Sequence, residues 1–260
     1  MAGGGKDPDM CAPPPTIGLP VYPGEKDLFQ FAQNFEFLEG EFFMFGALGY
    51  GYDTVAPGMA VKNEFGGIPR PLLNLSDGVF ADIMNDAFGY NLNPPFDPYN
   101  DTLKYLIAAY VIPYVGVVTA VGANPSVRGY ESKRLLAGLL AVEAGQDAII
   151  RTLLYERKYE LVPPYNITVA EFTIKISELR NRLAMCGVKD EGLIVPMPLG
   201  AEGKLTTNIL SADNDSLAYQ RTPNEALRVL YLTGSECQPG GFFPQGANGK
   251  IAKEFLISPC

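Results

Sequence analysis

The chain has 260 residues, 47% of them hydrophobic and 11% aromatic, which suffices for one sizeable core or at most two. Its net charge of −9 and pI near 4.6, without a run of lysines or arginines, exclude the clustered basic surface that nucleic-acid binding needs. It contains no histidine and no CxxC spacing, which excludes the usual zinc sites and a Cys–His catalytic pair. The cysteines at 11, 186, 237 and 260 leave two disulfides open, and the first residues lack the apolar stretch of a signal peptide.

The first predicted helix follows a Gly- and Pro-rich segment, residues 1–25, which we expect to form an extended arm. From 26 to 48, apolar residues recur at three- and four-residue spacings, which indicates a helix facing a core. This stripe consists of Phe31, Phe35, Leu38, Phe42 and Phe45. Repeated Gly and Pro between 49 and 78 then predict a long loop.

A short helix is predicted from 79 to 88, capped by Ser76 or Asp77. Residues 103–123 are the most apolar segment and approach the roughly 20 residues that a membrane span requires. Pro113 and several tyrosines suit a kinked central helix of a bundle better, so we expect no membrane span.

The next helix is predicted from 130 to about 160. We expect its apolar residues to face inward and its basic residues to face solvent. The inward set is Leu135, Leu139, Val142, Ile149 and Leu153, and the outward set is Lys133, Arg134, Arg151, Arg157 and Lys158. Glu143 and Gln146 fall near the apolar stripe and therefore need partners, because an uncompensated buried carboxylate is costly.

Capping signals mark the remaining helices. Thr168 and Glu171 have capping-box spacing, and Gly187 is the expected terminal glycine of that helix. Residues 188–221 are predicted to be loop, 222–234 a short helix, and 251–256 a final helical turn.

Several runs of the sequence together resemble the plant desiccation-related proteins, which belong to the ferritin-like superfamily. The resemblance covers about residues 27 to 256 and rests on runs such as NFEFLEGEFFMFGALGYGYD, GGIPRPLLNLS, PPFDPYNDTLKYLIAAYVIPYVG, RLLAGLLAVEAGQDAIIRTLLYER and PGGFFPQGANGKIAKEFL. It implies an all-α, ferritin-like helical bundle in a secreted or cell-wall protein linked to drying. The expected organisation is an arm over 1–25, the bundle over 26–187, and a loop-rich C-terminal extension over 188–260 packed on the bundle.

The sequence departs from this family at the second bundle helix. Family members carry roughly thirty further residues there, including a Glu-x-x-His helix, where this chain has only GMAVKNEF. In metal-binding relatives the third helix supplies a glutamate where this chain has Pro113, and the fourth supplies Glu-x-x-His where it has Glu143 and Gln146. The resemblance therefore implies an incomplete bundle with a degenerate metal site, built from Glu36 or Glu39 with Glu143 and Gln146. We expect no metal and no cofactor.

Loss of a bundle helix exposes apolar surface on its neighbours. Exposure of such surface costs about 25 cal/mol per Å² in free energy, so another element or molecule must cover it. One interpretation is that the loop, the short helix or a second subunit fills the gap. The other is that part of the gap persists as a small-molecule site with carboxylates at its base, since such sites are apolar hollows with a few polar groups. The residues expected to line it are Phe35, Phe42, Tyr105, Tyr110, Tyr114 and Gln146.

Two functions are compatible with this sequence. The first is a stress-associated or small-molecule-binding protein without metal. The alternative is a cofactor-free enzyme of the cyclase or isomerase type, in which Glu36, Glu39 and Glu143 act as general acid and base. Against the acid/base role stands the interpretation that these acids pair with Arg134, Arg151 or Gln146 inside the bundle. The expected partners are a small-molecule ligand and a homo-oligomer covering the gap, with no nucleic acid.

Overall fold

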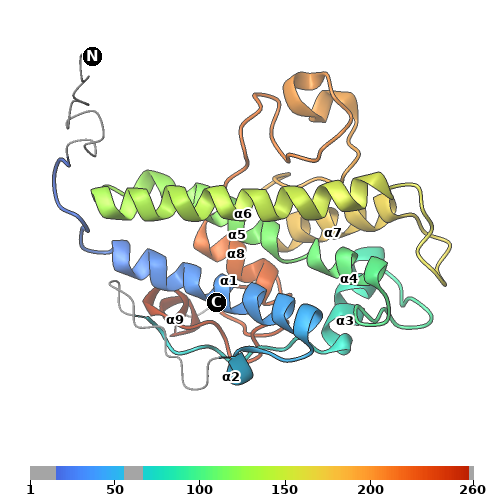
Figure 1. Ribbon diagram of the computed structural model, residues 1–260, viewed down its shortest axis with the longest axis horizontal. Helices are drawn as coiled ribbons and strands as arrows, with labels where there is room; N and C mark the ends of the chain where they lie inside the picture. Colours follow the sequence, from blue (N-terminus) through green and yellow to red (C-terminus); the bar gives the residue numbers. More distant parts are fainter. Residues whose placement is uncertain (1–15, 56–66, 258–260) are drawn as a thin grey trace, which may run out of the picture.

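The computed structural model describes residues 16–55 and 67–257, and every regular element within them is helical (Figure 1). The two long helices, α1 (Glu25–Leu48) and α6 (Tyr130–Glu156), run in the same direction. Between them the chain returns through α4 (Thr102–Ala109) and α5 (Pro113–Ala123), which run the opposite way. The predicted all-α fold is confirmed.

Helix α1 begins and ends at glycines with positive φ, Gly24 and Gly49, and buries most of its predicted stripe. Its first residue ties it to the start of α6. The Glu25 carboxylate accepts hydrogen bonds from the backbone N–H groups of Arg128 and Gly129 at 2.5 and 2.9 Å, and from the Ser132 hydroxyl at 2.8 Å. Burial raises the pKa of Glu25, but these bonds outweigh it and lower the pKa to about 2.

The apolar segment after residue 102 is broken into α4 and α5, and Pro113 is the first residue of α5. Thr102–Ser126 is, within the described ranges, the one segment with the length and composition of a membrane span, at a mean hydropathy of 2.0. Since 72% of its most apolar window is buried inside the protein, it has the surroundings of a core helix.

The inward face predicted for α6 is wrong at four of its five residues, and the outward face is wrong at Arg151, whereas Lys133 and Arg134 are exposed as predicted. Val142 and Ile149 are 59% and 62% exposed, and Leu135 and Leu153 are also exposed, whereas Arg151 is fully buried. The buried face of α6 instead carries Glu143, Asp147 and Arg151 between a few aliphatic side chains. Periodicity identified the helix, but the rule that charged residues face solvent assigned its faces incorrectly.

Helix α7 (Val169–Ala184) opens with the predicted capping box, in which Thr168 and Glu171 bond reciprocally. Its end differs from the prediction. Met185, at φ 66°, takes the left-handed position directly after the helix, and Gly187 follows two residues later.

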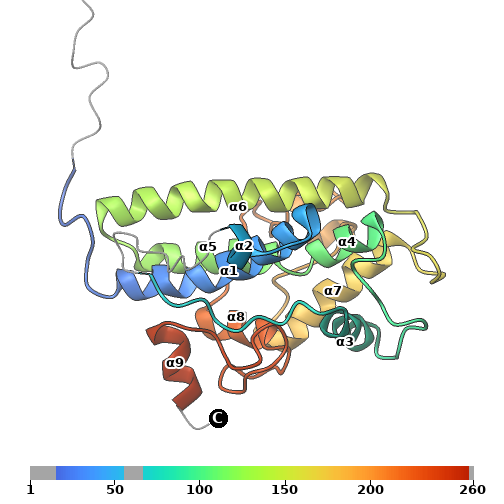
Figure 2. The same ribbon diagram turned by 60° about the horizontal axis from the view of Figure 1, so that its bottom comes forward.

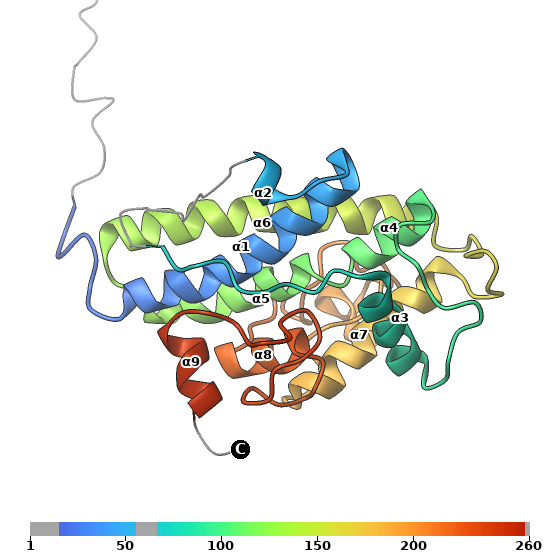
Figure 3. The same ribbon diagram turned by 90° about the horizontal axis from the view of Figure 1, so that it is seen from below.

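Three shorter helices pack along one side of the bundle (Figures 2 and 3). They are α3 (Asp77–Phe88), α8 (Pro223–Leu230) and α9 (Lys250–Ile257). The four-residue α2 (Tyr52–Val55) lies across α1 from them, and 3-10 turns occur at Asn124–Ser126, Met197–Leu199 and Ala201–Gly203. Helix α3 packs on α7, α8 joins α5, α7 and α9, and α9 lies against α1. Ser76 precedes α3, as predicted, and α8 opens with a second capping box between Thr222 and Glu225.

Within the described part of the chain, only α2 separates α1 from α3, so no long second bundle helix is present there. Arg70 holds α2 in place through ion pairs to Glu41 at 2.9 Å and Asp53 at 2.6 Å. The shortened junction itself, residues 56–66, lies outside the described residues, as does most of the predicted N-terminal arm. Cys186 is a free, exposed thiol, so the alternative of two disulfides is not realised.

Candidate functional site

A small apolar cavity of about 100 Å³ lies where α1, α5 and α6 meet. Phe31 and Phe35 line it from α1, Ala120 from α5, and Leu139 from α6. Its two acidic groups are Glu36 of α1 and Glu143 of α6. The cavity is therefore an apolar hollow with carboxyl groups on its wall, the form expected of a small-molecule site.

Three predicted site residues, Glu36, Glu39 and Glu143, come together beside this cavity. The Glu143 carboxyl is within hydrogen-bonding contact of both Glu36 and Glu39. The approach depends on Gly116 of α5, because a Cβ there would lie 3.0 Å from Glu39 Oε1 and 3.2 Å from Glu143 Oε2. Glycine in a helix interior costs roughly 0.5–1 kcal/mol relative to alanine, and here it makes room for two carboxyl groups.

The three carboxyl groups hold protons more tightly than free glutamates do. Burial is the main cause, and repulsion between the carboxylates adds to it. Together they raise the pKa of Glu143 to about 8 and the pKa of Glu39 well above its usual value. The pKa of Glu36 is also raised by burial, but a hydrogen bond from Glu143 counteracts the rise. The contact between Glu36 and Glu143 therefore lowers the pKa of Glu36 and raises that of Glu143, which favours the shared proton on Glu143.

Inside the described part of the molecule, no cation neutralises this cluster. Arg134 pairs with Glu131 on the surface at 2.9 Å, and the closest carboxylate to Arg151 is Asp147, at 4.0 Å. Glu39 and Glu143 are only 4% and 5% exposed, yet among the described residues no group outside the three carboxyls donates a hydrogen bond to Glu39 Oε1 or Glu143 Oε2. The alternative in which the acids pair with arginines is therefore not what this structure shows.

These residues do not fit a dinuclear metal centre. In ferritin-like di-metal proteins each of two helices gives a glutamate and each of the other two gives Glu-x-x-His. Here α1 and α6 supply only Glu36, Glu39 and Glu143, and the position of the α6 histidine is taken by the exposed Gln146. No group of three or more ligating side chains suited to a metal ion occurs among residues 16–55 and 67–257.

Gln146 lies instead at a second, more open hollow on the other side of the cluster. This groove, about 440 Å³, runs between the second half of α1 and α6 and is bordered by Tyr52 of α2. Glu36 lines both hollows and Glu39 lines the groove. The carboxyl cluster therefore separates an apolar cavity from a solvent-facing groove.

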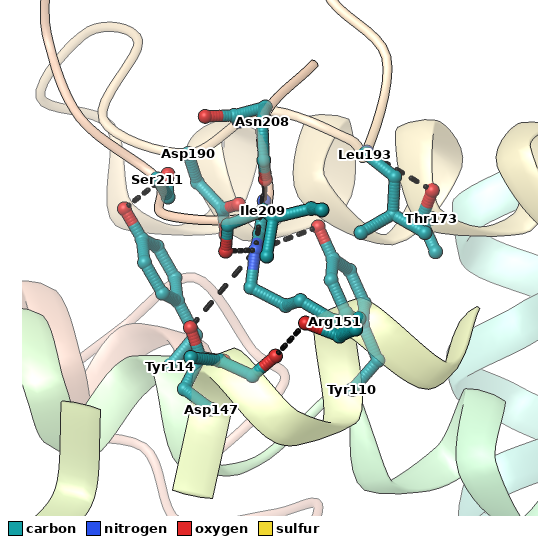
Figure 4. A network of polar contacts seen from close by, with 12 residues as sticks. Tyr110, Tyr114, Asp147, Arg151, Thr173, Asp190, Leu193, Asn208, Ile209 and Ser211 are labelled. Carbon is teal, nitrogen blue, oxygen red and sulfur yellow. Dashed lines mark hydrogen bonds and ion pairs between the residues drawn. The ribbon is translucent and has the colours of Figure 1, made fainter. Parts of the chain in front are cut away.

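Of the aromatic residues predicted to line the site, only Phe35 does so. The Phe42 ring stacks on Tyr105 with centroids 4.8 Å apart, and the Tyr105 hydroxyl donates to the Phe42 carbonyl at 3.0 Å. Tyr110 and Tyr114 do not line the cavity, and their hydroxyls bond to the C-terminal extension, at the Glu191 carbonyl and at Ser211. Figure 4 shows Tyr114 beside Ser211. Helical spacing placed all of these side chains in the core but could not tell which of them border a hollow.

Tyr110 and Tyr114 belong to a buried network centred on Arg151 (Figure 4). The Arg151 guanidinium lies 5.1 and 5.5 Å from the two ring centroids and donates to the carbonyls of Asn208 and Ile209. Burial raises the pKa of the neighbouring Asp147 to about 6, although Arg151 counteracts the rise. This network fixes the loop after α7 onto the bundle, and no local motif in the sequence indicated it.

Comparisons with known proteins identify the same family of helical bundles. The sequence model of the family described as "Ferritin-like domain" matches residues 24–156, which run from the start of α1 to the end of α6. The chain is 52% identical to "Ferritin-like catalase Nec2" from Nesocodon mauritianus, over 95% of this chain and 91% of the relative. It is 47% identical to "Desiccation-related protein PCC13-62" from Craterostigma plantagineum, over 86% of this chain and 82% of the relative. No solved structure matches the chain.

In both alignments the number of aligned positions exceeds the number of residues that this chain contributes. The first spans 283 positions and includes 95% of the chain, about 247 residues, so about 36 positions of the relative have no counterpart here. The second spans 258 positions and includes about 224 residues of the chain, which leaves about 34. These lengths agree with the loss of one bundle helix and its connection.

Proposed function

Because this chain belongs to the plant desiccation-related, ferritin-like family of stress-associated proteins, we propose that it is a metal-independent member that binds a small apolar molecule in the α1–α5–α6 cavity. The observation that carries the proposal is the apolar cavity ending on Glu36 and Glu143. About 100 Å³ suits a group of the size of one six-membered ring, since an apolar cavity of about 150 Å³ can hold benzene.

The carboxyl groups favour a ligand that carries a basic nitrogen or another proton acceptor next to its apolar part. A protonated amine placed against Glu36 and Glu143 would supply the positive charge that the cluster lacks, and would lower the pKa of both acids. We do not extend catalase activity, stated in the name of the Nesocodon mauritianus relative, to this chain, because its donor set does not fit the dinuclear centre.

The binding test uses benzylamine as the probe and benzyl alcohol as its uncharged counterpart. Millimolar benzylamine is expected to raise the Tm of the protein by a few degrees at pH 7 to 8, with a smaller shift for benzyl alcohol. Glu143→Gln should lose the preference for the amine, and Ala120→Phe or Ala120→Leu, which fill the cavity, should lose both shifts while retaining helical circular dichroism. Glu178→Gln removes a surface glutamate 59% exposed and serves as the control.

Two outcomes would contradict binding in this cavity. If neither probe shifts the Tm of the wild-type protein at about 10 mM, or if the shift survives in a folded Ala120→Phe variant, the cavity is not the binding site.

A second candidate function is catalysis by these acids without a cofactor, favoured by a Glu143 that keeps its proton near neutral pH at the cavity wall. In that reaction Glu143 donates a proton to a double bond or nitrogen of the bound molecule, and Glu36 accepts a different proton from it. The composition of the molecule is unchanged, so the reaction is an isomerisation or a ring closure. The direct contact between the two carboxyls then returns the proton from Glu36 to Glu143.

The test of catalysis looks for products of unchanged mass. Wild-type protein is incubated with alkaloid, terpenoid and phenolic compounds, and isomers are separated by chromatography with mass detection. An isomer formed by the wild type and by Glu178→Gln, but at least about 100-fold more slowly by Glu143→Gln, supports the enzyme, because proton transfer by one side chain contributes roughly 10²–10⁴-fold. Equal rates for all three proteins would exclude a role for Glu143.

A further inference from the structure

The outer face of α6 carries an apolar stripe that no described element covers. Its six positions alternate at spacings of four and three residues, which is the a/d pattern of a coiled coil. They are Leu135, Leu139, Val142, Gln146, Ile149 and Leu153. Every charged residue between 135 and 153, namely Glu143, Asp147 and Arg151, is at most 6% exposed, so the outer surface of this stretch is free of charge.

The stripe borders the place of the missing bundle helix. Gln146 of the stripe lines the groove between α1 and α6, and Leu139 lines the apolar cavity. Because α1 and α6 run in one direction and α4 with α5 in the other, a fourth helix that balances the bundle must run antiparallel to α6 (Figure 1). The relatives have about 35 further positions that this chain lacks, enough for such a helix and its connection.

The stripe is complementary to itself in that antiparallel direction. A two-fold axis at the level of Ala144 relates the stripes of two copies. It places Leu135 of one copy opposite Leu153 of the other, Leu139 opposite Ile149, and Val142 opposite Gln146. These are a-to-d pairs, the pairs that layer together in an antiparallel helix pair. Gly138 and Gly145 lie beside the stripe, and a Cβ added at either would meet nothing within 4 Å, so two such helices can approach closely.

We propose that this chain forms a two-fold dimer in which α6 of each copy takes the place of the other copy's missing bundle helix. The contact is isologous, because each copy offers the same patch. It accounts for the exposure of the α6 stripe and for the exposed Leu48 at the end of α1, which lines the groove.

The area of the contact predicts a dimer of moderate strength. The stripe is about 27 Å long at 1.5 Å per residue and about 10 Å wide, which gives roughly 300 Å² on each α6. Adding a similar area from the α1 edge brings the total for both copies to roughly 1,200 Å², at the low end of stable interfaces. Dissociation is therefore expected in the micromolar range of protein concentration.

The dimer would also complete the groove. Since Val142 of one copy meets Gln146 of the other, an apolar side chain lies at the groove that contains Glu36 and Glu39. A partner there shields the carboxyl cluster from solvent without contributing a charge. The proposal does not depend on a ligand in the cavity, so failure of either proposal leaves the other standing.

Sedimentation velocity over about 1 to 100 µM tests the contact. The wild type is expected to reach twice the 28.2 kDa chain mass. Val142→Glu with Ile149→Glu should remain monomeric throughout this range, because each change places a charge in the stripe. Ala137→Glu with Ala144→Glu is the matched control: both residues are exposed on the opposite side of α6, so this variant should dimerise like the wild type. A monomeric wild type at 100 µM, or a stripe variant that still dimerises, overturns the proposal.

Disulfide cross-linking tests the direction and register. Leu135→Cys and Leu153→Cys proteins are made in a Cys186→Ser background. Each protein is oxidised alone, and a mixture of the two is oxidised in parallel. The antiparallel register predicts a covalent dimer in the mixture that is at least about tenfold more abundant than in either protein alone, because only 135 and 153 of different copies lie within the roughly 7 Å that a disulfide bridges. Preferential cross-linking of position 135 to itself contradicts the proposed register.

Discussion

Glu143 is the residue on which the chemistry of the cluster turns, because it contacts both other acids and faces the cavity. Burial and repulsion raise its pKa, and no arginine or lysine offsets them at this point of the described structure. The consequence is a tightly held proton. This differs from Glu25, whose ionised form is stabilised by four hydrogen bonds from the chain around it.

The raised pKa of Glu143 predicts a pH-dependent stability. Its pKa rises from near 4.5 to about 8 on folding, so the folded state keeps a proton that the unfolded state releases. Stability is then present below about pH 4.5 and is lost as pH rises through about 8. Glu143→Gln should match the wild-type Tm near pH 4.5 and exceed it by several degrees at pH 9, on the order of 1–3 kcal/mol.

The control for this experiment is Glu178→Gln, a surface glutamate paired with Lys175 at 2.7 Å. It should track the wild type within about 1 °C at both pH values, since surface pairs contribute little. A Glu143→Gln variant whose Tm follows the wild type across the whole range would show that Glu143 is ionised in the folded protein.

At this scale the sequence was sufficient to find the acids but not their surroundings. Glu36 and Glu39 lie one turn apart, and Glu143 falls beside an apolar stripe, so helical spacing brings them to neighbouring faces. The role of Gly116 depends on how closely α5 approaches both other helices. That distance is set by tertiary packing and leaves no local mark in the sequence.

At the scale of helices, the middle of α6 departs from the usual amphipathic arrangement. Its buried face combines Glu143, Asp147 and Arg151 with aliphatic side chains, and Arg151 bonds to the Tyr110 hydroxyl and to the C-terminal extension, while Val142 and Ile149 face outward. The positions and most ends of the helices were predictable, because caps and periodicity are local. Which face is buried was not, because the extension that covers Arg151 lies some 40 to 60 residues away along the chain.

The packing of α5 on the start of α8 gives a prediction at this scale. A Cβ at Gly122 would collide with the Arg221 carbonyl oxygen, and the Arg221 N–H donates to the Val118 carbonyl at 2.9 Å. Gly122→Ala should therefore lower the free energy of unfolding by about 1–3 kcal/mol in urea denaturation.

Gly78→Ala in α3 is the matched control, since its nearest neighbour, Ser76 Oγ, would lie 3.6 Å from the new Cβ. This change should leave stability unchanged or raise it by about 0.4–1 kcal/mol by restricting the unfolded chain. If the two alanine variants lose the same stability, close approach of α5 and α8 is not what requires Gly122.

At the scale of the whole molecule, both relatives align over about 35 positions more than this chain supplies, and the described part of the chain has no long helix between α1 and α3. Resemblance to a family was needed to recognise this loss, because the remaining sequence still has the pattern of a series of well-formed helices. The structure adds that the adjoining faces were not rebuilt as polar surfaces.

Metal removal gives the prediction for the whole molecule. Purified protein should hold less than about 0.1 iron or manganese ion per chain by elemental analysis, and EDTA should change its Tm by less than about 1 °C. A resident ion at 100 times its Kd would stabilise the fold by about 2.7 kcal/mol, so its removal would be evident as a lower Tm. Two ions per chain that survive chelation would contradict the predicted loss of the metal site.

Gly116 offers a way to sort relatives of this chain without a structure. A Cβ at that position would lie 3.0 Å from Glu39 Oε1 and 3.2 Å from Glu143 Oε2, so alanine requires a small shift of these side-chain ends and the larger valine or leucine displaces them further. The residue in this column of an alignment therefore indicates which relatives have room for both carboxyl groups in this arrangement.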